Sequence, residues 1–107
     1  MRLDVNTVQQ VTDACFDLAM DGRLTEGQQQ AMLALGEHLR DALIGQLAVD
    51  FAAPLDAKVT AAAARLGIVN QDLQAEIAHL NAIDQTISEV TQLVGVFDDL
   101  VQSAAKL

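Results

Sequence analysis

The chain has 107 residues, of which 51% are hydrophobic and 3% aromatic, and its net charge is −9. This length and apolar content predict a single helical domain, residues 1–107, whose core needs no disulfide or structural metal. The negative charge argues against binding to nucleic acid or to an anionic membrane, because phosphate groups would be repelled.

The sequence carries no targeting or membrane signal that we can identify. Cys15 is the single cysteine and cannot form a disulfide within the chain, which is typical of a reducing compartment. The segment after Met1 lacks the apolar stretch of a secretory signal, and no apolar run approaches the ~18 residues that a membrane span needs. We therefore expect a cytoplasmic protein, unless it is exported by a machine that needs no cleavable signal.

Apolar residues spaced by three and four predict a first helix over residues 5–20. Its stripe consists of Val8, Val11, Cys15 and Leu18. Asp4 or Asn6 is the candidate N-cap, and Gly22 suits a left-handed position after the helix. Because Cys15 belongs to the stripe, we expect its thiol to pack as a small hydrophobic group and not to act as a nucleophile.

A second helix is predicted over residues 26–51. Thr25 and Gln28 have the spacing of a capping box. The apolar stripe consists of Met32, Leu35, Leu39, Leu43 and Leu47, widened by Ile44 and Phe51. Gly36 and Gly45 each weaken a helix by roughly 1 kcal/mol relative to alanine, and they either allow a close helix approach or are neutral. The helix should end before Pro54.

A third, short helix is predicted over residues 54–66, with Pro54 in its first turn. Its inward side chains would be Leu55, Val59, Ala62 and Leu66. Gly67 is predicted to end this helix, and Asn70 to cap a fourth helix over residues 71–106. The four alanines at 61–64 add little bulk, so a neighbouring backbone can come close.

The fourth helix carries the most regular pattern in the chain. Its heptad stripe consists of Leu80, Ile83, Ile87, Val90, Val94, Phe97, Val101 and Ala104. The acids Asp72, Asp84, Glu89, Asp98 and Asp99 lie off this stripe, and no lysine or arginine occurs between Leu66 and Ala105. A helix of ~54 Å would outreach its neighbours and leave part of the stripe uncovered. This predicts a homodimer, with a compact monomeric bundle as the alternative.

One pair of residues has the spacing of a metal ligand set. Glu76 and His79 form the Glu-x-x-His unit of di-metal carboxylate bundles, which need a second such unit. His38, the only other histidine, has Leu35 where the motif requires an acid. We therefore expect no metal and no cofactor, and a small-ligand or metal-binding bundle remains the alternative.

Together these patterns predict an all-α four-helix bundle with a long C-terminal spine helix. No catalytic motif is present, so we expect a non-enzymatic, acidic protein-interaction module of the adaptor, chaperone, immunity or accessory type. The predicted interface consists of Leu80, Ile83, Ile87, Val90, Val94, Phe97, Val101, Asp84, Glu89, Asp98 and Asp99. The acids would steer a basic protein partner. An inhibitor that mimics nucleic acid is a further alternative.

Overall fold

The first two helices form an antiparallel hairpin in the computed structural model, which describes all 107 residues. Helix α1 is Val5–Ala19 and α2 is Glu26–His38. The Asp4 carboxylate caps α1, and Thr25 forms the predicted capping box with Gln28. Both predicted helix N-caps are confirmed. No residue has a positive φ, so the left-handed position predicted for Gly22 is wrong.

The second predicted helix ends earlier than residue 51. Helix α2 continues through a π-helical turn, η1 (Leu39–Leu43), into α3 (Ile44–Leu47). At Ala48 the backbone leaves the helical region, with φ −82° and ψ 49°. The chain then turns so that the backbone N–H of Phe51 donates to the carbonyl of Met1 at 2.8 Å. Residues 48–51 are therefore drawn out of the helix by a tertiary contact.

The boundary predicted between the third and fourth helices is wrong. Helix α4 runs unbroken over Asp56–Ala78, after the short 3-10 turn η2 (Ala53–Leu55) that contains Pro54. Gly67 therefore lies inside α4, where the helix is exposed, and burial of the neighbouring turns outweighs its cost of about 1 kcal/mol. The real break is the loop 79–82.

Helix α5 consequently spans only Ile83–Ala105, 23 residues, and the predicted spine helix over 71–106 does not form. That segment contains the end of α4 and the whole of α5, and these two helices fold back on each other. Each is thus short enough for its neighbours to cover. The fold class itself, four helices packed against each other, is confirmed.

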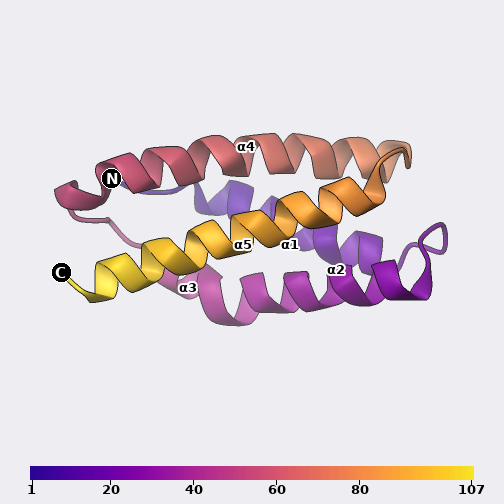
Figure 1. Cartoon of the computed structure of the whole chain (residues 1–107), viewed down its shortest axis with the longest axis horizontal. Coiled ribbons are helices and arrows are strands. Elements are labelled where there is room, and N and C mark those ends of the chain that lie inside the picture. Colours follow the sequence, from indigo (N-terminus) through magenta and orange to yellow (C-terminus); the bar gives the residue numbers. More distant parts are fainter.

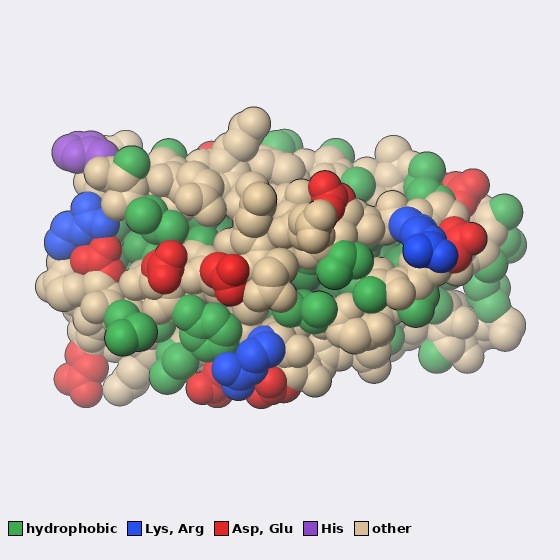
Figure 2. All heavy atoms as spheres, turned by 180° about the vertical axis from the view of Figure 1, so that it is seen from behind, with side chains coloured by type: hydrophobic (Ala, Val, Ile, Leu, Met, Phe, Trp, Pro, Cys, Tyr) green, Lys and Arg blue, Asp and Glu red, His purple; other side chains and the backbone are tan.

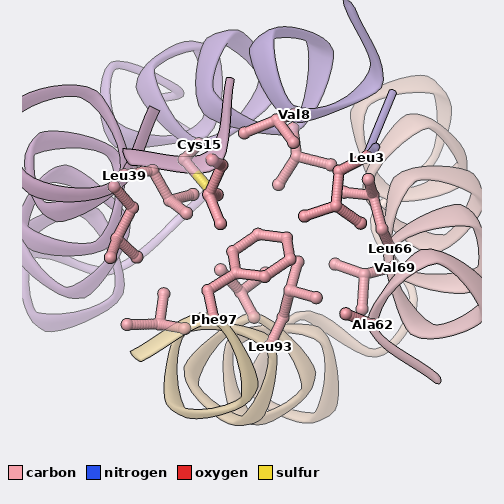
Figure 3. Close-up of a cluster of buried hydrophobic side chains, with 14 of the residues drawn as sticks. Leu3, Val8, Cys15, Leu39, Ala62, Leu66, Val69, Leu93 and Phe97 are labelled. Carbon is pink, nitrogen blue, oxygen red and sulfur yellow. The ribbon is translucent and has the colours of Figure 1, made fainter. Parts of the chain in front are cut away.

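The four helices alternate in direction along the chain, but α2 and α4 are not neighbours (Figure 1). Around the bundle the order is α1, α2, α5, α4, as the view down the bundle in Figure 3 shows. The connection between α3 and α4 crosses one end of the molecule, so α1 lies parallel to α4, and α2 parallel to α5. The molecule measures 43 × 21 × 19 Å.

All four helices contribute to one apolar core, with the fully buried ring of Phe97 among side chains from every side (Figure 3). The inward residues predicted for the first and third helices, Cys15 included, are all buried. Burial raises the pKa of the Cys15 thiol to about 12, which makes the thiolate inaccessible at neutral pH. No helix has both the length and the apolar character needed to cross a membrane.

Candidate interaction groove

The hollows of the molecular surface all lie on one side of the bundle. Three cavities are present, and every residue that lines them belongs to α4, α5 or the loop between these helices. The two larger ones, about 500 and 440 Å³, share Ala61 and Gln92 and so form one continuous depression, which we call the α4–α5 groove. Its lining is Lys58, Ala61, Ala64, Arg65, Ile68, Val69, Gln85, Ser88, Glu89, Gln92, Gly95, Val96 and Asp99.

The groove exists because small side chains meet where the two helices separate. Helices α4 and α5 converge at the loop 79–82 and diverge toward the end that carries the C-terminus (Figure 1). Ala61 and Ala64 face this gap from α4, and Gly95 faces it from α5. A Cβ added at Gly95 would have nothing within 4 Å. The side chains available are too short to fill the space between the backbones.

The two walls of the groove differ in charge. Helix α4 has no acid between Asp56 and Asp72, and its two cations, Lys58 and Arg65, stand on the groove wall. The Lys58 ammonium donates to a carboxylate oxygen of Asp99 at 2.8 Å and to the Ser103 hydroxyl at 3.0 Å. Apolar surface lies between the polar groups, since Ile68 is 60% exposed. The groove is therefore mixed in character, with apolar and charged side chains among its lining residues.

Glu89 is the most unusual group in the groove. One of its carboxylate oxygens, Oε2, is buried and has no hydrogen-bond partner. The pKa of Glu89 is raised, first because a proton on one carboxyl group can form a hydrogen bond with the other, that of Asp72, and then by desolvation and the charge of Asp72, while Arg65 and Gln85 lower it. Oε2 thus lacks a partner only when both carboxyl groups are charged. Two carboxyl groups, one on each helix, thus share a site in which no lysine or arginine forms an ion pair with either of them.

The third cavity, about 230 Å³, lies at the loop end of α4 and α5 and contains the Glu-x-x-His pair. Glu76 is only 5% exposed, and its two carboxylate oxygens accept from the backbone N–H groups of Asn81 and Ala82 at 2.8 and 2.6 Å. The carboxylate thus holds the loop 79–82 against the end of α4. His79 is exposed, and no three metal-ligating side chains are grouped anywhere in the structure.

His38 does not join His79. Its ring lies on the other hairpin, 3.3 Å from a carboxylate oxygen of Asp98. Arg40, in the adjoining turn η1, pairs with Asp41 at 2.7 Å and lies over the Phe16 ring. The second Glu-x-x-His unit that a di-metal centre needs is absent from the structure as it is from the sequence.

Within the predicted interface, the apolar stripe faces inward. Val90, Val94 and Phe97 are buried in the core. The remaining stripe residues are partly buried and pack against that core: Leu80, Ile83, Ile87, Val101 and Ala104. The uncovered stripe expected from the sequence is therefore absent, because α2, α3 and α4 pack against α5 within the chain.

The predicted interface acids are divided between different surroundings. Glu89 and Asp99 line the groove. Asp84 accepts a hydrogen bond from the Gln28 amide at 2.9 Å, and Asp98 lies beside His38. The cations missing from α5 are thus supplied in part by neighbouring helices, with Lys58 of α4 as the clearest case.

The groove-lining residues of α4 were not among the predicted site residues. The signal that marks them is compositional: residues 57–71 hold two cations and no acid in a chain of net charge −9. The opposite face, in Figure 2, shows apolar side chains in separate patches among uncharged polar ones, with acids more numerous than cations. It carries no cavity.

Comparison with known proteins yields no relative. No protein-family model matches the chain, and no curated protein or solved structure is significantly similar to it. The site must therefore be interpreted from its own chemistry.

Proposed function

We propose that this protein is a non-enzymatic interaction module that binds a helix of a partner protein in the α4–α5 groove. The observation that supports this most is that the cavities are confined to the side of the bundle formed by α4 and α5. An amphipathic helix laid between two helices is a recurring mode of protein recognition. The apolar side chains of Ile68 and Val96 would contact its apolar face, and the polar side chains of the groove would fix its register.

This proposal moves the interface to another side of α5. The stripe packs against the core and holds α5 in the bundle, so we assign the contacts with the partner to other residues of this helix. The binding residues of α5 would instead be its outward flank, which includes Gln85, Ser88, Gln92 and Val96. Glu89 and Asp99 keep the role of interface acids that the sequence pattern suggested.

We propose a basic protein as the partner, in preference to a second copy of the chain. The argument for a homodimer depended on an uncovered stripe, and the stripe is covered. Two copies with a net charge of −9 each would also repel one another. A partner of positive charge would be attracted at long range, and its association would weaken as salt screens that attraction.

Affinity purification from cells of the source organism tests this function with a matched pair of variants. Ala64 lines the groove, whereas its neighbour Ala63 is also exposed but lies outside the groove. We expect the wild type and Ala63→Trp to retain a stoichiometric partner at low salt. Ala64→Trp, which fills the groove, should lose it. Equal recovery with both variants would refute groove binding, and recovery of the chain alone as a dimer would indicate self-assembly.

A further inference from the structure

A single buried oxygen atom suggests how a partner would be recognised. Glu89 Oε2 is shielded from solvent and has no hydrogen-bond partner when both Glu89 and Asp72 are charged, since the bond between these two carboxyl groups needs a shared proton. Burying an acceptor without a donor costs about 1–3 kcal/mol, and more for a charged group. Glu89 lines both the α4–α5 groove and the adjoining loop cavity, so a group entering the groove arrives next to it.

No lysine or arginine forms an ion pair with the carboxylate of Glu89. Asp72 lies beside it on α4 and adds a second negative charge. Arg65, on the groove wall, lowers the pKa of Glu89 through its charge but forms no ion pair with Glu89, and its guanidinium donates to Gln92 at 3.2 Å. Lys58 is engaged further along with Asp99 and Ser103. The carboxyl pair Asp72–Glu89 is therefore left without a paired cation.

We infer that the partner helix inserts one lysine or arginine side chain into the groove, where it pairs with the carboxyl groups of Glu89 and Asp72. This inference rests on the proposed function and names the chemical feature that selects the partner. A cationic donor would satisfy Glu89 Oε2 and relieve the repulsion between the two carboxyl groups at once. The apolar side chain of Ile68 would pack against the aliphatic part of the same lysine or arginine side chain.

A displayed library of amphipathic helices, selected on the full-length protein, tests the inference without knowledge of the natural partner. Selections are run in parallel on the wild type, on Glu89→Gln and on Glu37→Gln. Glu37 is exposed on α2 and forms no hydrogen bond through its side chain, so its variant makes the same change in net charge away from the groove. Circular dichroism verifies that each variant is folded.

We expect helices selected on the wild type to share one lysine or arginine position and to lose binding to Ala64→Trp. Their affinity should fall at least about tenfold on Glu89→Gln, as expected for loss of a charge-assisted hydrogen bond. It should change little on Glu37→Gln. Groove-binding helices without a fixed cation, or with equal affinity for Glu89→Gln, would overturn the inference and leave the groove function intact. If no selected helix is blocked by Ala64→Trp, both proposals fail.

Discussion

The two hairpins of this bundle use small residues in opposite ways. Between α1 and α2, Gly36 lies under the Phe16 ring, whose nearest atom would be 3.1 Å from an added Cβ. Between α4 and α5, Ala61, Ala64 and Gly95 face a groove. A small residue closes a helix interface when a large side chain fills the space it leaves. When small residues face each other across diverging helices, the space remains open to a ligand.

The largest expected effect on stability comes from a substitution at the centre of the core, where both hairpins pack. Phe97→Ala should lower the free energy of unfolding by about 3–5 kcal/mol, because a fully buried ring leaves a cavity. Val96→Ala, next to it on the groove side, should cost less than about 1.5 kcal/mol, since that side chain is only half-buried. Urea denaturation followed by circular dichroism measures both. Similar losses would mean that the core is not centred on Phe97.

The next effect concerns the loop that joins the helices of the second hairpin. Glu76→Ala should cost about 1–3 kcal/mol, because two backbone N–H groups in the loop before α5 lose their acceptors. Hydrogen exchange at the amides of Asn81 and Ala82 should accelerate more than exchange in α1. Unchanged exchange at these two amides would show that the Glu76 carboxylate does not hold the loop 79–82.

Two glycine substitutions sharpen the contrast between filled and empty space. Gly67→Ala should stabilise the protein by about 0.5–1 kcal/mol, because its added Cβ meets nothing within 4 Å and the helix gains propensity. Gly36→Ala should gain less or destabilise, because the Phe16 ring must shift to admit the methyl group. Thermal unfolding compares the two, and an equal gain from both would contradict the close packing of Phe16.

The smallest expected effect depends on pH. Because the folded protein raises the pKa of Glu89 above its ordinary value of 4.5, it binds this proton more tightly than the unfolded chain does. The contribution of Glu89 to stability is therefore present below pH 4.5 and is lost as the pH rises through the raised pKa. Glu89→Gln should raise Tm by a few degrees, roughly, at pH 7 and not at pH 4. A difference in Tm that does not vary with pH would contradict the carboxyl pairing.

Much of the fold follows from local chemistry in the sequence. The caps at Asp4 and Thr25 need only residues within three positions of the helix start, and the inward stripe of α1 needs only its own periodicity. These features are set by neighbouring residues, so the sequence pattern is sufficient to predict them.

The break between α4 and α5 could not be predicted in the same way. Gly67 has the character of a helix end, but its cost is small beside the burial of Leu66 and Val69 in the same turn. The real break depends on the Glu76 carboxylate reaching the amides of the following loop, an interaction for which the sequence shows only a Glu-x-x-His spacing. That spacing suggested a set of metal ligands and not a contact between a carboxylate and a loop.

The groove was equally hidden from a reading of single helices. A heptad stripe indicates that a helix has a partner, but not whether the partner belongs to the same chain. Here Phe97 and its neighbours on the stripe are buried by other helices of the same chain. The groove emerges only when α4 and α5 are placed together, because its lining comes from both.

The most direct test of the central claim is photocrosslinking in cells of the source organism. A photoreactive phenylalanine analogue is placed at Ile68, which lines the groove, or at Met20, which is 86% exposed and lines no cavity. We predict a single heterologous adduct from position 68 and none of that mass from position 20, with the adduct abolished by Ala64→Trp. Equal adducts from both positions, or an adduct at position 68 that Ala64→Trp leaves unchanged, would contradict the assignment of the α4–α5 groove as the binding site.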